Sequence, residues 1–234
     1  TSSESASVFS EVFNNKKSLL LEHSLLFPSV LLFVCTPSYF DAACRSIESS
    51  LLHAPKWGVI VVGIGSEPSF LSMVVHANRS LRFKIDWPCD IASSSEKRSF
   101  SANSRAPLMH ALAECQVYQN IFYVDSDSLI VNDPSTLLDS MSESGKAIGF
   151  RSYEKHVFCD GIGSMPFKSG AIMLLESKSP STRALLRDYS GFVIPMLGQW
   201  FSDQRGLMYL SLKQDHIPFI HVYGKRINDW SCSF

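Results

Sequence analysis

Two carboxylates lie two residues apart in the segment IFYVDSDSLIV (121–131), directly after an apolar run. Side chains two apart on an extended segment point the same way, so Asp125 and Asp127 would face one site. Neighbouring carboxylates repel each other, and a divalent cation removes that repulsion. Hard oxygen ligands suit Mg²⁺ or Mn²⁺, which also bind substrate phosphates and stabilise charge on a leaving phosphate. The pair therefore indicates a metal–phosphate site, and the alternative is a turn whose carboxylates cap backbone amides.

Apolar runs and amphipathic segments alternate around this pair. Continuous apolar runs bounded by turn residues are typical of strands buried on both faces. Strand–helix alternation predicts a mostly parallel sheet with right-handed crossovers, whose ligands bind beyond the carboxyl ends of the strands. Asp125 and Asp127 fall at that edge. The expected strands cover 29–35, 57–65, 82–87 and 121–124, and the expected helices cover 41–54, 68–77 and 106–115.

A polar N-terminal segment, 1–24, precedes one domain, 25–234. The serine-rich start of that segment, 1–7, is expected to fray.

The second half of the chain is less regular, and its polar stretches are expected to be loops. The expected strands of this half are 146–150, 170–176 and 217–224, and the expected helices are 180–192 and 202–213. The expected loops are 151–169 in this half and the serine-rich segment 92–104 in the first half, with a tail at 225–234.

The composition excludes some partners. The 21 basic and 22 acidic residues leave a net charge of −1, which gives no long-range case for nucleic acid or an anionic membrane surface. The longest apolar run, 25–35, is too short to span a bilayer and contains Pro28. None of the six cysteines forms a C-x-x-C pair, and Cys35 and Cys115 are expected to be buried free thiols. The sequence is compatible with an upstream anchor and with either the cytoplasm or a Golgi or ER lumen as compartment. It does not specify the oligomeric state.

The carboxylate segment, extended to IFYVDSDSLIVNDPSTLL, resembles the D-x-D segment of nucleotide-sugar glycosyltransferases of the GT-A fold, especially the retaining family 8 type. The segments that carry the rest of the resemblance, in the family's order, are LLFVCTPSYFDAACRSIESSLL, FKSGAIMLLES, WFSDQRGLMYL and IHVYGKRINDW. The resemblance implies a single Rossmann-like, mostly parallel sheet flanked by helices. It also implies metal-dependent transfer of a sugar, with retention, from a UDP-sugar to a hydroxyl of a glycan, protein or small molecule.

The metal ligands follow from the resemblance position by position. Asp125, Asp127 and His221 would hold Mn²⁺ or Mg²⁺. The family has a lysine six residues after its histidine, where this chain has Ile227. Lys225 is therefore the substitute candidate for neutralising the diphosphate.

The nucleotide side of the site is assigned in the same way. Thr36 and Tyr39 would line the nucleotide pocket, with the tyrosine ring stacking on the base. Ser126, between the two aspartates, would face the ribose. Arg105 would lie near the diphosphate or the donor sugar.

The sugar side of the site falls on two later segments. Ser169 and Gly170 would let the backbone approach the sugar closely, although Lys168 stands where the family has asparagine. Asp203 would accept hydrogen bonds from sugar hydroxyls, and Gln204 would lie near the anomeric carbon. Asp203 is also a good helix N-cap without any sugar.

Two other functions compete with sugar transfer. A phosphatase of the HAD type would use Asp125 as nucleophile and Asp127 as general acid, but Leu129 breaks the last position of its motif. The second competing function is that of a GT-A-like module that binds nucleotide or glycan without turnover. Dinucleotide binding fails, because VVGIGSEP (61–68) has Pro68 at the third glycine position, so these glycines are expected to form a strand-end turn.

Overall fold

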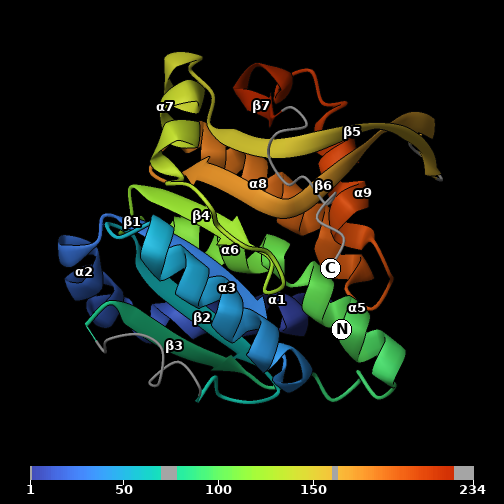
Figure 1. Cartoon of the computed structure of the whole chain (residues 1–234). Helices are drawn as coiled ribbons and strands as arrows, with labels where there is room; N and C mark the ends of the chain where they lie inside the picture. Colours follow the sequence, from blue (N-terminus) through green and yellow to red (C-terminus); the bar gives the residue numbers. More distant parts are fainter. Residues whose placement is uncertain (1, 70–77, 160–162, 224–234) are drawn as a thin grey trace.

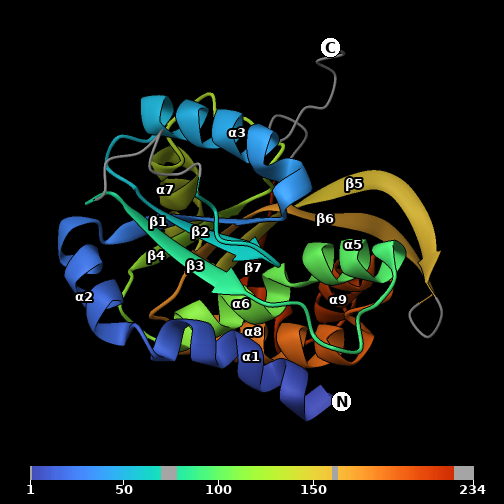
Figure 2. The same ribbon diagram turned by 90° about the horizontal axis from the view of Figure 1, so that it is seen from below.

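A computed structural model describes residues 2–69, 78–159 and 163–223. The described strands form one seven-stranded sheet in the order β3-β2-β1-β4-β6-β5-β7, with helices on both faces (Figures 1 and 2). The strands β1 to β4 run parallel, β6 runs antiparallel to its neighbours β4 and β5, and β7 runs parallel to β5. The strands are β1 (Ser29–Cys35), β2 (Gly58–Ile64), β3 (Ser80–Ile85), β4 (Asn120–Val124), β5 (Ile148–Cys159), β6 (Gly163–Glu176) and β7 (Ile220–Tyr223).

The helices divide between the two faces of the sheet. The helices α3 and α7 pack with one set of buried side chains, and α1, α2, α5, α6, α8 and α9 pack with the other. The alternating sides of β1 explain this division, because Leu31 and Phe33 join the first set and Leu32 joins the second. The helices are α1 (Ser2–Asn14), α2 (Lys17–Leu26), α3 (Phe40–His53), α5 (Ser94–Asn103), α6 (Arg105–Glu114), α7 (Ser135–Glu143), α8 (Pro180–Val193) and α9 (Ser202–Leu210). Short 3₁₀ turns are η1 (Pro37–Tyr39), η2 (Ile194–Met196) and η3 (Ile217–Phe219).

The strands and helices expected in the first half are confirmed wherever the structure describes them. The strands predicted at 29–35, 57–65, 82–87 and 121–124 are β1 to β4, and most of their residues are buried. The helices predicted at 41–54 and 106–115 are α3 and α6, and most of the segment predicted as a helix at 68–77 lies outside the described residues. Cys35 and Cys115 are buried free thiols, as predicted.

Three expectations of irregular structure are wrong. Residues 94–103 of the expected loop form α5, which Ser93 and Glu96 begin with a reciprocal capping box. The expected loop at 151–169 belongs largely to β5 and β6, which pair with each other well beyond their contacts with β4 and β7 (Figure 1). The N-terminal start is helical from Ser2, and α1 is held because Phe9 and Phe13 are buried in the core.

The helices and the last strand of the second half agree more closely with the predictions. The helices predicted at 180–192 and 202–213 are α8 and α9, and the strand predicted at 217–224 begins only at Ile220. Pro218 lies in the preceding 3₁₀ turn, because proline has no backbone N–H to donate to a sheet. Within the described ranges, no helix is long and apolar enough to cross a membrane.

The carboxyl ends of β1, β2 and β4 meet at one edge of the sheet. The predicted strand-end turn after β2 is confirmed: Gly65 has a φ of +80° and donates its N–H to the carbonyl of Ile85. A Cβ at this position would overlap the indole ring of Trp87. Glycine is therefore required here both by the left-handed backbone and by the close approach of a tryptophan that borders the site.

Candidate active site

A cavity of about 790 Å³ opens at the carboxyl ends of β1 and β4. It is lined by the end of β1 with η1, by Trp87 after β3, by the end of β4, by the helices α5 and α6, and by the start of α9 with the turn before it. This is the edge at which the sequence predicted a ligand site. Of the predicted site residues, those that line the cavity are Thr36, Tyr39, Arg105, Asp125, Ser126, Asp127, Asp203 and Gln204.

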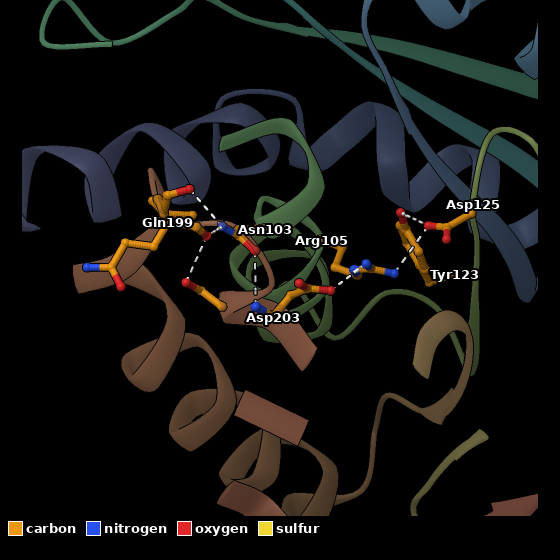
Figure 3. A network of polar contacts seen from close by, with 8 residues as sticks. Asn103, Arg105, Tyr123, Asp125, Gln199 and Asp203 are labelled. Atoms are coloured by element: carbon orange, nitrogen blue, oxygen red, sulfur yellow. Dashed lines mark hydrogen bonds and ion pairs between the residues drawn. The ribbon is translucent and has the colours of Figure 1, made fainter. Parts of the chain in front are cut away.

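A buried arginine joins two of the predicted carboxylates (Figure 3). Arg105 lies in the first turn of α6, and its side chain is 6% exposed. Its Nη1 is 3.2 Å from Asp125 Oδ1, and its Nη2 forms an ion pair with Asp203 Oδ2. The hydroxyl of Tyr123 donates to the same Asp125 Oδ1 at 2.8 Å. The D-x-D segment after β4 is therefore tied to the start of α9 through one guanidinium group.

Burial controls the protonation of this group. Burial raises the pKa of Asp125 to about 6, although Arg105 and the Tyr123 hydroxyl act to lower it. Burial also raises the pKa of Asp203, against the opposing effect of Arg105. One guanidinium cannot fully offset two carboxylates, of which Asp203 is buried and Asp125 is partly exposed, so the site favours either a proton or a further cation.

The stability of the protein should therefore depend on the ionisation of Asp125. Its folded-state pKa of about 6 lies above the value of about 3.9 in an unfolded chain, so the folded state binds more protons between these pH values. The stabilisation is present at low pH and is lost as pH rises through about 6. Between pH 4 and 7.5 the wild type should lose about 2–3 kcal/mol of unfolding free energy relative to Asp125→Asn. Urea denaturation of both proteins across this range measures the difference, and a difference that does not change with pH would contradict the assignment.

A second polar contact fixes the start of α9. Asn103, the last residue of α5, donates from Nδ2 to the carbonyls of Leu197 and Gln199, both at 2.7 Å. Its Oδ1 accepts the backbone N–H of Asp203 at 3.0 Å (Figure 3). One side chain thus holds the turn in place and positions Asp203 beside Arg105. The sequence analysis missed Asn103, whose serine-rich surroundings favoured an exposed loop.

The residues predicted for the nucleotide lie together after β1 and β4. Tyr39 is half-exposed at the cavity, as a stacking ring requires. Thr36 Oγ1 is 3.0 Å from Ser38 Oγ. Ser126 is buried, and its hydroxyl donates to the carbonyl of Val34 at 2.7 Å. That bond ties the end of β4 to β1 and leaves the Ser126 oxygen at the cavity as an acceptor, so its contact with a ribose stays a prediction.

The residues predicted for the sugar come from α9 and β6. Gln204 lines the cavity, and its Oε1 is buried without a hydrogen-bond partner in the described part of the chain. A buried polar atom in that position calls for a ligand or a water. Ser169 and Gly170 lie in β6, and the register Val124↔Ile172 places their backbone beside the carboxyl end of β4.

The two aspartates fit a divalent cation, but His221 does not join them. Asp127 is exposed at the cavity and has no ion pair with another described residue, and both groups offer the hard oxygens that Mg²⁺ or Mn²⁺ prefers. His221 lies in β7, where its Nδ1 is 3.4 Å from Ser144 Oγ. Across residues 2–69, 78–159 and 163–223, no three His, Cys, Asp or Glu side chains are grouped as metal ligands. Lys225 lies outside the described residues.

One wall of the cavity contains none of the predicted site residues. Its residues lie on and before α5 and in the turn before α9, and the aromatic and basic ones are Trp87, Lys97, Arg98, Trp200 and Phe201. We call these five residues the aromatic–basic wall. The adjacent pairs Lys97–Arg98 and Trp200–Phe201 were visible in the sequence. Neither pair has a spacing that indicates a site without knowledge of the fold.

No family model and no curated protein matches the chain, but solved structures do. The galactosyltransferase LgtC, in complex with donor and acceptor sugar analogs, has a TM-score of 0.57 at 14% identity over 84% of this chain and 73% of that one. Mouse xyloside xylosyltransferase 1 has a TM-score of 0.51 at 14% identity over 84% and 85%. The glycosyltransferase GlyE of Streptococcus pneumoniae, at 15% identity and a TM-score of 0.49, is covered over only 46% of its length. The likeness to LgtC and to the xylosyltransferase shows that the chain has the GT-A fold, as predicted.

Proposed function

We propose that this GT-A-fold chain transfers a sugar from a nucleotide-diphosphate donor to an acceptor hydroxyl. The observation that carries the proposal is the link made by Arg105 inside the cavity. It joins Asp125, in the segment that resembles the D-x-D motif, to Asp203, in the segment that resembles the Asp-Gln helix start. Two motifs that are far apart in the sequence thus meet at the ligand edge of the sheet.

The donor is proposed to lie along the cavity from η1 to α9. Tyr39 would stack on the base, and the sugar would lie against Asp203 and Gln204. Each carboxylate oxygen that is not paired with Arg105 is an acceptor for sugar hydroxyls, and the unpartnered Gln204 Oε1 is a further one. A UDP donor and retention of configuration are proposed from the resemblance to the family 8 type.

A divalent cation is proposed to bind at Asp125 and Asp127, with diphosphate oxygens and water completing its ligands. When bound, Mn²⁺ or Mg²⁺ would stabilise the negative charge that builds up on the departing diphosphate. Arg105 contributes mainly by position, because its charge is shared between two carboxylates. It holds Asp125 at the diphosphate end and Asp203 at the sugar end of one cavity.

The test is metal-dependent turnover of nucleotide-sugars by the wild-type protein. With a panel of UDP-, GDP- and other donors, we expect slow release of nucleoside diphosphate from one donor with Mn²⁺, and loss of this activity with a chelator. Binding of a nucleoside diphosphate with no turnover of any donor would favour the inert binding module. Hydrolysis of a phosphomonoester without turnover of any nucleotide-sugar would favour the phosphatase alternative.

A further inference from the structure

We propose that the aromatic–basic wall is the acceptor subsite, and that it selects an acceptor sugar carrying an anionic group such as a carboxylate, phosphate or sulfate. The inference rests on the proposed function, because it names the acceptor class of the same cavity. It uses residues to which the sequence analysis gave no role.

The wall comes from other elements than the residues proposed for the nucleotide. Tyr39 and Asp127 follow β1 and β4, whereas the wall comes from α5, the segment before it and the turn before α9. The helices α5 and α9 lie side by side in both views of the fold (Figures 1 and 2). Asp203 directly follows the turn, so a donor sugar held at Asp203 has the wall as its neighbour. That is the place an acceptor must occupy to reach the reacting carbon.

Two aromatic rings of the wall are held half-exposed at the cavity. Trp200 is 49% exposed and Phe201 is 47% exposed, and their ring centroids are 5.1 Å apart. Phe201 has a φ of 64°, a left-handed conformation that is rare for a bulky side chain and that the surrounding contacts must hold in place. Asn103 and the Ser202 hydroxyl, which bonds to Met196 and Gln199 carbonyls at 2.8 and 2.9 Å, fix this turn. Rings fixed in this way can pack against the apolar C–H face of a sugar.

The basic residues of the wall form no ion pair within the described part of the chain. Lys97 and Arg98 pair with no described carboxylate: Asp125 and Asp203 in the same cavity are paired with Arg105, and Asp127 is taken by the proposed cation. Lys97 Nζ lies 5.8 Å from the ring centroid of Trp87, which packs against Phe100 at 6.0 Å.

An acceptor that fills this part of the cavity must remove water from the half-buried Lys97. Removing water from a cation is costly unless an anion replaces it, and a charge-assisted hydrogen bond does so. The wall therefore favours an anionic acceptor over a neutral one of the same shape. Lys97 and Arg98 could instead contact the donor diphosphate. The test must therefore distinguish an effect on acceptor binding from an effect on donor binding.

The test compares matched acceptors with and without the basic pair. With donor and Mn²⁺, the wild type should show a KM for p-nitrophenyl glucuronide at least about tenfold below that for p-nitrophenyl glucoside, a discrimination of about 1.4 kcal/mol. The double variant Lys97→Gln, Arg98→Gln should lose this preference and keep the KM for donor hydrolysis measured without acceptor. Arg187→Gln, an exposed arginine of α8 outside the cavity, should change neither value. A wild type without preference, or a double variant with a raised donor KM, would overturn the inference.

A second measurement does not depend on turnover. Calorimetric binding of the glucuronide without donor should be detectable for the wild type and lost in the double variant, while Trp200→Ala should weaken binding of both glycosides. Equal binding of glucuronide and glucoside by the wild type would overturn the inference even if the donor were turned over. Failure of the proposed function is a different result: no nucleotide-sugar is turned over by the wild type, whatever its acceptor binding.

Discussion

Replacing Arg105 by methionine should lower the free energy of unfolding by about 3–5 kcal/mol, the cost of breaking a buried ion pair. The side chains of Arg105 and Asp203 are 6% and 2% exposed, so the carboxylate left behind would be buried without a charge partner. Asp125 would lose the same partner and keep only the hydroxyl of Tyr123. Urea denaturation at pH 7 measures the loss.

Two further variants show whether burial is the cause. Arg187 also pairs with a carboxylate, at 3.9 Å from Glu114, but its side chain is 69% exposed. Arg187→Met should therefore cost no more than about 0.5 kcal/mol. Arg105→Met combined with Asp203→Asn should recover part of the loss, because a neutral amide is cheaper to bury than an unpaired carboxylate. If Arg105→Met were as mild as Arg187→Met, the arginine would not be the structural link of the site.

The position of the site could be predicted from local patterns, but its contacts could not. Continuous apolar runs identify β1, β2 and β4, because strands covered on both faces must be apolar along their whole length. The two aspartates at the end of β4 then fall on the ligand edge by topology alone. The contact between Arg105 and Asp203 joins the starts of α6 and α9, and it depends on how α8 packs against both helices. No pattern within any of these helices specifies that packing.

The regions that were predicted wrongly have few local sequence features that indicate their observed secondary structure. The α5 segment is rich in serine, which suggests a loop, and only the spacing of Ser93 and Glu96 marked a helix start. The β5–β6 ribbon is stabilised by hydrogen bonds between two strands, and its register shifts interrupt any regular alternation of side chains. His221 was assigned by resemblance alone, and its place in β7 depends on pairing with β5.

Replacing Asp127 by asparagine should reduce metal-dependent turnover of the nucleotide-sugar by about 100-fold or more, because the proposed cation loses one of its two carboxylate ligands. The substitution should have little effect on the stability of the fold. Asp127 is exposed at the cavity and has no ion pair within the described residues, so the free energy of unfolding should stay within about 0.5 kcal/mol of the wild type. Steady-state donor hydrolysis over a range of Mn²⁺ concentrations, with urea denaturation of the same samples, measures both effects.

Asp133 provides the matched control from the same segment. It lies outside the cavity lining, and its Oδ1 accepts the backbone N–H of Ser135 at 2.9 Å, near the start of α7. Asp133→Asn should therefore cost at most about 1 kcal/mol of unfolding free energy and leave turnover within about twofold. The two variants thus predict opposite patterns, with activity lost at Asp127 and only stability affected at Asp133. If Asp127→Asn kept full turnover at low Mn²⁺ concentration, the cation would not bind at this pair and the proposed role of the D-x-D segment would be wrong.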